Sequence, residues 1–217
     1  KYVDPRRLLY PGRVTPQTFG TMVEHILNTY FAHPAYFTVE GRPYFSIYEL
    51  EKLVESFGGV AQTREALDHF RARTRAVGFP DLHLNAVVWG QPVLPGEKTP
   101  ADPRRLLADL GFDSFTSYVW VHHVPLHEFP ETDYNHVRDC YFEYWDRAVG
   151  EIPLPYFPNA TMGWDSSPRT VQSEVFRPVG YPFTPLIGGN TPERFREALR
   201  MVRDRLDARP APRVLNI

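Results

Sequence analysis

An aromatic ring, a carboxylate and a guanidinium follow one another closely in a single glycine-containing stretch. Residues 158–170 read PNATMGWDSSPRT, so Trp164 and Asp165 come directly after Gly163, with Arg169 close behind. An exposed indole needs a flat apolar surface to stack on, and a sugar ring offers such a face of C–H groups. The stretch therefore fits a carbohydrate site. The alternative is that Trp164 plugs the end of a barrel while Asp165 and Arg169 pair to hold the loop.

Cleavage of a glycosidic bond usually needs two carboxyl groups that flank the bond. Glu49 and Asp165 are the candidates for this catalytic pair. Glu49 follows an apolar run, where partial burial beside Tyr48 would suit a general acid. Its alternative role is that of an acid in the first turn of a helix, stabilised by the helix dipole. Asp165 would bind sugar hydroxyls or orient Arg169.

Side chains suited to gripping a sugar recur where the predicted strands end. Aromatic rings supply the stacking faces, while an imidazole, a guanidinium and an amide supply hydrogen bonds. If these strands are parallel, their carboxyl ends meet at one edge of the sheet. The substrate-binding candidates are Tyr48, Trp89, Tyr118, Trp120, His122, Trp164, Arg169 and Asn216.

No metal or cofactor is expected from the sequence. His122, His123 and His127 with Glu128 lie in a stretch interrupted by proline, and their spacing is not a recognised metal-ligand pattern. No glycine-rich phosphate motif follows a predicted strand, and no serine occupies a nucleophile elbow. The one cysteine, Cys140, lies among aromatic residues on a helical pattern and is expected to be a buried, inert thiol.

The composition is that of an ordinary globular chain. Of its 217 residues, 42% are hydrophobic and 23% are charged. A formal net charge of −2 argues against nucleic acid or an anionic membrane surface as a partner. No apolar run approaches the roughly 20 residues of a membrane span. No targeting segment is recognised at the start of the sequence shown, and the sequence therefore does not indicate a cellular compartment. The 22 prolines fall mostly between periodic segments and indicate long, shaped loops.

Apolar runs alternate with helical patterns along the chain after an irregular lead-in at residues 1–16. Thr-Pro and Asp-Pro pairs start helices, and glycines end them. The predicted helices cover residues 16–31, 49–57, 63–77, 103–110, 132–150 and 192–206. The predicted strands cover residues 43–48, 82–89, 112–120, 155–162 and 213–217. Such near-continuous apolar strands between helices are typical of a parallel sheet covered by helices.

The fold expected from this alternation is α/β, of the (β/α)8 TIM-barrel type. The absence of a phosphate-binding fingerprint favours a barrel over a dinucleotide-binding sheet. A whole barrel has eight strands and about 250 residues, so this chain is expected to supply the C-terminal five strands. Residues 1–217 are expected to form a single domain. A missing barrel segment or another chain would then cover the open sheet edges.

Three ordered passages carry a resemblance to a known family. They are HPAYF with GRPYFSIY at residues 33–48, FDSFTSY at 112–118 and MGWDSSPR at 162–169, and RVLN at 213–216 follows in the same order. Together they are similar to the glycoside hydrolase family 99-like proteins, also called WbsX-like. The resemblance implies a (β/α)8 barrel that acts on glycans, in hydrolases and in polysaccharide biosynthesis. The residues that it implies for the wall of the glycan site are Tyr48, Tyr118, Trp164, Asp165 and Arg169.

The resemblance also implies where the principal catalytic acids lie. In the family, α-mannoside linkages are cut with retention, through the sugar's own 2-hydroxyl and two carboxylates. Those carboxylates belong to a segment upstream of the His-Pro passage, so they are expected outside residues 1–217.

The leading hypothesis is a glycoside hydrolase that acts on a polysaccharide or oligosaccharide in an aromatic-lined groove. A glycosyltransferase-like protein of polysaccharide biosynthesis and a non-catalytic glycan-binding protein are the alternatives.

Overall fold

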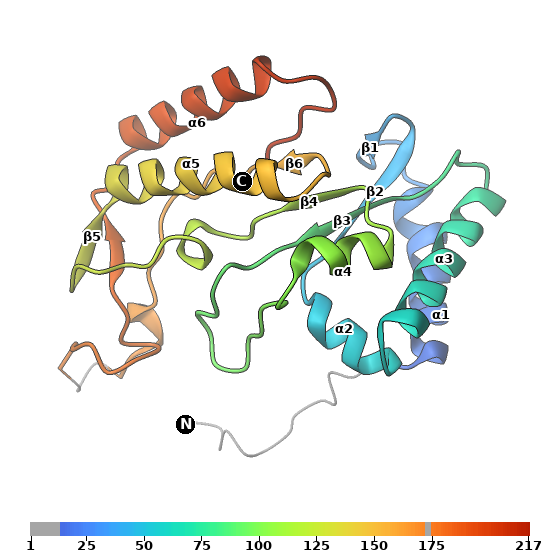
Figure 1. Ribbon diagram of the computed structural model, residues 1–217, viewed down its shortest axis with the longest axis horizontal. Coiled ribbons are helices and arrows are strands. Elements are labelled where there is room, and N and C mark those ends of the chain that lie inside the picture. Colours follow the sequence, from blue (N-terminus) through green and yellow to red (C-terminus); the bar gives the residue numbers. More distant parts are fainter. Residues whose placement is uncertain (1–13, 172–174) are drawn as a thin grey trace.

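A mainly parallel, curled sheet forms the centre of the protein (Figure 1). The computed structural model describes residues 14–171 and 175–217. Within them, five strands pair in the order β1-β2-β3-β4-β6. β2, β3, β4 and β6 run parallel, and β1 returns antiparallel to β2. Their bounds are β1 Thr38–Val39, β2 Arg42–Ile47, β3 His83–Val87, β4 Ser114–Thr116 and β6 Tyr156–Phe157. The expected α/β class is confirmed.

The last predicted strand, at residues 213–217, is reduced to one bridge. Asn216 pairs in parallel with Asn159, just beyond β6. The Ala160 N–H donates to the Asn216 carbonyl at 2.9 Å, and the Asn216 N–H donates to the Pro158 carbonyl at 2.9 Å. The five predicted parallel segments therefore lie side by side in chain order, although the last of them is not a full strand.

Three short strands were not expected. β1 covers part of the outer edge of β2, while β5 (Glu131–Asp133) and β7 (Leu186–Gly188) form a separate two-stranded parallel sheet. Runs of two or three residues are too short for an alternating pattern to show in a sequence.

The helices begin and end largely where the local sequence dictates. The Thr15 side chain accepts a hydrogen bond from the Thr18 N–H at 3.1 Å, and Pro16 opens the first helix. Gly58 and Gly111 end two helices in the left-handed conformation. The bounds are α1 Pro16–His25, α2 Leu50–Phe57, α3 Val60–Ala76, α4 Pro103–Leu110, α5 Tyr134–Glu151 and α6 Pro192–Asp207. A π-helix at Ile26–Phe31 continues α1, and 3₁₀ turns occupy Trp120–His122 and Ser167–Arg169.

Two predicted helix starts were wrong. α3 begins at Val60 rather than Thr63, and the buried Thr63 hydroxyl donates back to the Gly59 carbonyl at 2.8 Å. Thr132 belongs to β5, so Asp133 caps α5 instead by accepting from two backbone N–H groups. Thr63 therefore lies within the first turn of α3, and Thr132 lies in the strand that precedes α5.

The predicted strand at residues 112–120 ends early, at Thr116. The chain then turns into the 3₁₀ helix that begins at Trp120. Trp120 is fully buried, and its indole N–H donates to the Asn159 carbonyl at 3.0 Å. Because this ring stacks on Tyr141 of α5, with centroids 5.4 Å apart, it fixes α5 against the sheet.

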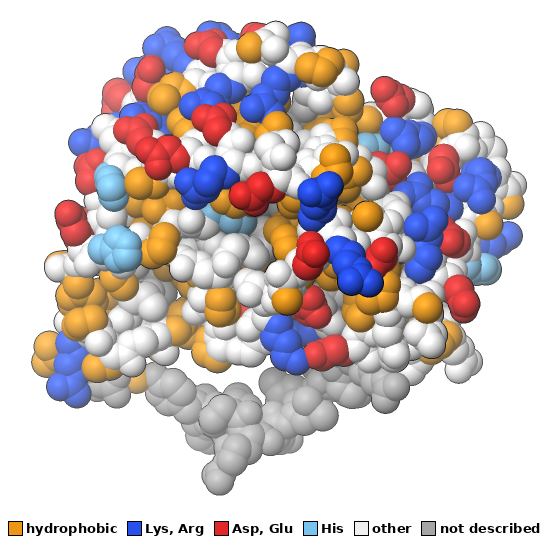
Figure 2. All heavy atoms as spheres, in the orientation of Figure 1, with side chains coloured by type: hydrophobic (Ala, Val, Ile, Leu, Met, Phe, Trp, Pro, Cys, Tyr) orange, Lys and Arg blue, Asp and Glu red, His pale blue; other side chains and the backbone are white. Residues whose placement is uncertain are grey.

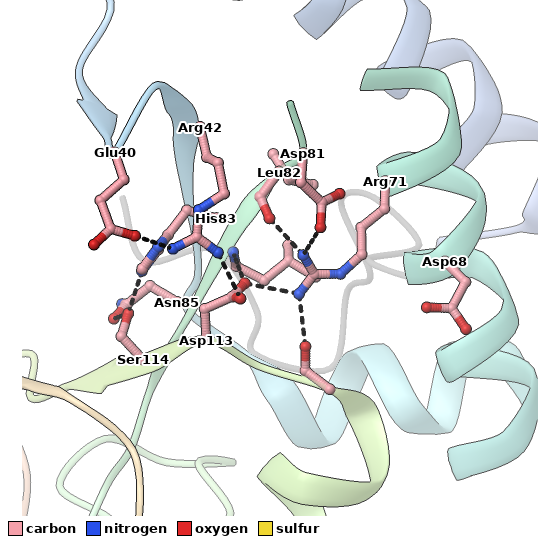
Figure 3. Close-up of polar contacts among 12 residues, drawn as sticks. Glu40, Arg42, Asp68, Arg71, Asp81, Leu82, His83, Asn85, Asp113 and Ser114 are labelled. Atoms are coloured by element: carbon pink, nitrogen blue, oxygen red, sulfur yellow. Dashed lines mark hydrogen bonds and ion pairs between the residues drawn. The ribbon is translucent and has the colours of Figure 1, made fainter. Parts of the chain in front are cut away.

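A charged network joins the amino ends of the parallel strands (Figure 3). The Arg71 side chain of α3 extends to the segment that precedes β4, where it donates to the Asp113 carboxylate and the Gly111 carbonyl, both at 2.7 Å. It also donates to Asp81 and to the Leu82 carbonyl. The Arg71 side chain is 11% exposed, so this end of the sheet is tied together by a nearly buried guanidinium.

Charges of both signs are interspersed on the face that Figure 2 presents. In the described ranges, no helix combines the length and the apolar character that crossing a membrane requires.

Candidate functional site

A hollow of about 480 Å³ opens at the carboxyl ends of the parallel strands. Ser46 near the end of β2, Val87 of β3 and Thr116 of β4 contribute to its lining, as do Asn159 and Asn216 from the bridged segments. None of the described side chains that line it is charged, and its polar side chains are hydroxyls and amides. Parallel sheets of this kind bind their ligands at this edge.

Side chains from neighbouring strands hold the floor of this central hollow in place. The Thr116 hydroxyl donates to the Phe157 carbonyl at 2.6 Å and accepts from the Asn216 amide at 2.7 Å. The Asn216 amide, in the segment paired beyond β6, therefore bonds directly to Thr116 of β4.

A row of buried hydroxyls leads away from the floor toward α5. The Ser117 hydroxyl lies 2.7 Å from that of Tyr156, which lies 2.6 Å from that of Tyr141. The Asn159 N–H donates to the Tyr141 hydroxyl at 2.9 Å. Burial raises the pKa of Tyr141 to about 12, and that of Tyr156 well above its usual value, so both phenols are neutral near pH 7.

A second row of hydrogen-bonded polar side chains runs from Ser46 of β2 across β3 and β4 to His83. The Asn85 amide donates to Ser46 at 2.9 Å and accepts from Ser114 at 2.8 Å, and Ser114 contacts the His83 ring at 2.8 Å. His83 stacks between Tyr44 and Phe157. Burial lowers the pKa of His83 to about 4, so its ring is neutral near pH 7.

Four of the predicted binding residues form one aromatic group beside the central hollow. Tyr48 makes edge contacts with Trp89 and Tyr118, at centroid distances of 4.9 and 4.8 Å. Trp89 stacks on His122 at 5.1 Å. Tyr118 lines the hollow and is 46% exposed, whereas Trp89 and His122 are buried beneath it. This aromatic rim therefore offers Tyr118 and Tyr48 to a ligand, supported by the other two rings.

Glu97 is a site neighbour that sequence reasoning missed. Its buried carboxylate lies 3.2 Å from the His122 Nε2 and accepts from the Val93 and Leu94 N–H groups at 2.7 and 2.8 Å. Burial lowers the pKa of His122, although the Glu97 carboxylate opposes that effect. Glu97 thus fixes the loop after Trp89 to the rim. In the sequence it is one acid in a Pro/Gly-rich loop, with no spacing that indicates His122 as its partner.

Trp164 and Asp165 line a second hollow of about 430 Å³. Its other lining residues include Glu131 of β5 and Asn190, which directly precedes the α6 cap. Gly163 lines both hollows, so they are adjacent. Asp165 accepts from the Ser167 N–H at 2.8 Å and thereby holds the turn at Ser167–Arg169. The structure therefore divides the expected single groove into two neighbouring hollows.

The remaining predicted residues are dispersed. Glu49 lies beside Tyr48, where its carboxylate pairs with Lys52 at 2.9 Å, and it does not line the hollow of Asp165. The two candidate catalytic acids are thus not brought into one cavity. Arg169 is exposed and forms no ion pair with Asp165. Trp120 belongs to the core rather than to a binding surface, because its ring is fully enclosed.

The histidines do not gather around a metal position. His122 and His123 are packed among aromatic rings, while His127 is exposed. Among the described residues, no group of three or more His, Cys, Asp or Glu side chains is placed to hold a metal ion.

Fold and site together define an α/β protein whose parallel sheet carries, at its carboxyl edge, an aromatic rim and a hollow lined by apolar side chains and by hydroxyl and amide groups. Among solved structures, it resembles the GH99 endo-alpha-mannosidase from Bacteroides thetaiotaomicron, with a TM-score of 0.44 and 16% identity. The same enzyme in complex with BIS-TRIS-propane gives a TM-score of 0.43 and 15% identity. Each match covers 95% of this chain, which spans about half of the enzyme chains, 50% and 53% respectively. The sequence matches none of the protein-family models and none of the curated proteins compared with it.

Proposed function

We propose that this protein is a glycan-processing enzyme, a glycoside hydrolase of the family 99-like group, and that its glycan lies in the central hollow. The observation that carries the proposal is the combination of an uncharged hydroxyl and amide lining with the exposed Tyr118 ring at its edge. The MGWDSSPR and GRPYFSIY passages of the sequence support the same family.

A sugar suits this hollow for two physical reasons. Its hydroxyls exchange hydrogen bonds with groups such as those of Ser117, Asn159 and Asn216, without a charge to desolvate. Its C–H face packs on a tyrosine ring that is otherwise exposed to water. In this proposal the parallel strands belong to a (β/α)8 barrel, and residues 1–217 lie in one domain.

Hydrolysis also requires carboxylates near the bound glycan. In the described part of the chain, no carboxylate lines the central hollow. Asp165 lines the adjacent second hollow, and Glu49 lies beside Tyr48 outside both. This arrangement favours a second candidate function, in which these residues bind a glycan without cleaving it.

Calorimetric titration with a panel of neutral oligosaccharides tests binding in the central hollow. Replacing Tyr118 with Ala should weaken binding about tenfold, because the loss of one stacking ring costs roughly 1–2 kcal/mol. Tyr30→Ala is the matched control, because Tyr30 is 51% exposed but lines none of these hollows. Equal affinity of the two variants would overturn the proposal.

Release of new reducing ends separates hydrolysis from binding alone. If Asp165 acts on the transition state, Asp165→Asn should lower turnover by far more than it lowers affinity. The substitution keeps a side-chain oxygen for the Ser167 N–H, so the turn is preserved. Binding without any release of reducing ends would instead support the non-catalytic candidate.

A further inference from the structure

The second hollow differs from the central one in its charge. Glu131 and Asp165 both line it, and no lysine or arginine is among its lining residues in the described chain. Trp164 forms part of the same wall. Two carboxylates beside an indole suit a cationic ligand, because an ammonium group gains from both carboxylates and from the face of the ring.

The position of Glu131 follows from the small sheet that carries it. Side chains alternate along β5, so Glu131 and Asp133 are exposed while Thr132 between them is buried. β7 runs alongside, and a Cβ atom on Gly188 would lie only 2.3 Å from a Glu131 carboxylate oxygen. The absence of a side chain at Gly188 therefore leaves the space that the Glu131 carboxylate occupies beside the hollow.

The nearby basic groups do not neutralise these two acids. Arg194 lies close to Gly189, but it pairs with Asp133 at 2.6 Å. Within residues 14–171 and 175–217, neither Glu131 nor Asp165 forms an ion pair. Asp165 uses one carboxylate oxygen to accept from the Ser167 N–H, which leaves the other oxygen available.

Gly163 connects this acidic hollow to the central one. It lines both hollows, and a Cβ atom placed on it would lie 2.5 Å from the Asn190 amide nitrogen. A side chain at this position would therefore displace the Asn190 amide, which also lines the second hollow.

We infer that the second hollow binds a positively charged amino-sugar unit of the same glycan whose neutral unit occupies the central hollow. The ammonium group lies between Glu131 and Asp165, and the sugar ring lies against Trp164. This inference rests on the proposed function and adds a substrate class to it: glycans that carry a free amino group beside a neutral sugar.

Calorimetric titration with a glucosamine oligosaccharide and its N-acetylated counterpart tests the inference on the intact protein. At mildly acidic pH and low salt, the free-amine oligosaccharide should bind about fivefold more tightly, as expected for two partly exposed charge pairs. The preference should shrink at high salt. Glu131→Gln should reduce the preference and leave the affinity for the N-acetylated form unchanged. Asp165→Asn should also reduce the preference. The control is Glu128→Gln, because Glu128 is an exposed acid near Glu131 that does not line the hollow.

Each other outcome counts against the inference. Equal affinity for both oligosaccharides, no binding of either, or a Glu128→Gln effect as large as that of Glu131→Gln would overturn it. Thermal unfolding of each variant verifies that it is folded. The salt dependence is measured on the unmodified protein, so it tests the inference even if a variant does not fold. Failure of the proposed function is distinguishable, because neutral oligosaccharides would then fail to bind, whereas failure of this inference alone leaves their binding intact.

Discussion

The two ends of the parallel strands are built from different kinds of polar group. At the amino ends, Arg71 and Asp113 join several segments, and each makes multiple charge-assisted hydrogen bonds (Figure 3). At the carboxyl ends, the polar groups that line the central hollow are neutral hydroxyls and amides such as those of Ser117 and Asn216. Charges that are fully paired hold segments together but have little capacity left for a ligand. Neutral groups with spare hydrogen-bonding capacity are suited to recognise one. The amino ends are thus built for stability, whereas the carboxyl ends keep the free hydrogen-bonding groups that the proposed glycan site requires.

The largest effect is expected at the amino ends. Arg71→Ala should lower the free energy of unfolding by about 3 kcal/mol, because it removes one of the two guanidinium partners of the Asp113 carboxylate and the side-chain donor to two backbone carbonyls. Denaturant titration measures this loss. Arg75→Ala is the control: its side chain is 50% exposed and pairs with Asp81, so the loss should be below about 1 kcal/mol. Similar losses in the two variants would show that the network does not hold the strands together.

A further, pH-dependent effect is expected from His83, the first residue of β3. Its pKa is lowered from 6.5 to about 4, chiefly by burial and also by Arg42 and Arg71, while Asp113 and Glu40 oppose the shift. Between these pH values the unfolded chain binds a proton that the folded protein does not. The free energy of unfolding should therefore fall as the pH drops from 6.5 toward 4, by up to about 1.4 kcal/mol per unit.

The measurement is denaturant unfolding of the protein and of His83→Gln at several pH values in this range. The variant should show the shallower dependence, because it lacks the titrating ring. Parallel curves for the two proteins would contradict the assignment. Comparing the variant with the parent protein cancels the contributions of His122 and His123, whose pKa values burial also lowers.

The smallest effect on stability is expected at the carboxyl ends. Asn216→Ala removes the amide that donates to Thr116 and should lower the free energy of unfolding by about 1 kcal/mol. Because the same amide lines the central hollow, oligosaccharide affinity should fall roughly fivefold. Calorimetry and denaturant titration of one preparation give both values. Loss of stability with unchanged affinity would remove Asn216 from the site.

The sequence specified the fold wherever the signal was local. Thr15-Pro16, Asp102-Pro103 and Thr191-Pro192 each begin a helix as predicted, because cap and first turn lie within a few residues. β5 and β7 escaped prediction because their pairing joins residues about fifty positions apart. The early end of β4 at Thr116 also follows from tertiary packing, since the fully buried Trp120 ring fills the core beside α5.

The candidate site was predictable only in part, for the same reason. The strand ends identified Tyr48, Trp89 and Tyr118, and the parallel order brings these rings into contact. The second hollow was not predictable, because Glu131 of β5 and residues of β7 line it from a sheet absent from the predicted elements. Glu97 contacts His122 by way of a loop conformation that no spacing rule encodes.

The row of hydroxyls behind the floor has more than one possible arrangement of its protons. Tyr141 accepts from the Asn159 N–H, while either oxygen can be the donor in the contacts of Tyr156 with Tyr141 and with Ser117. When Tyr156 donates to Ser117, the Ser117 hydrogen is free for a ligand; when Ser117 donates to Tyr156, only its lone pairs are free. Ser117 lines the central hollow, so this one serine is able to meet a visiting molecule either as a donor or as an acceptor.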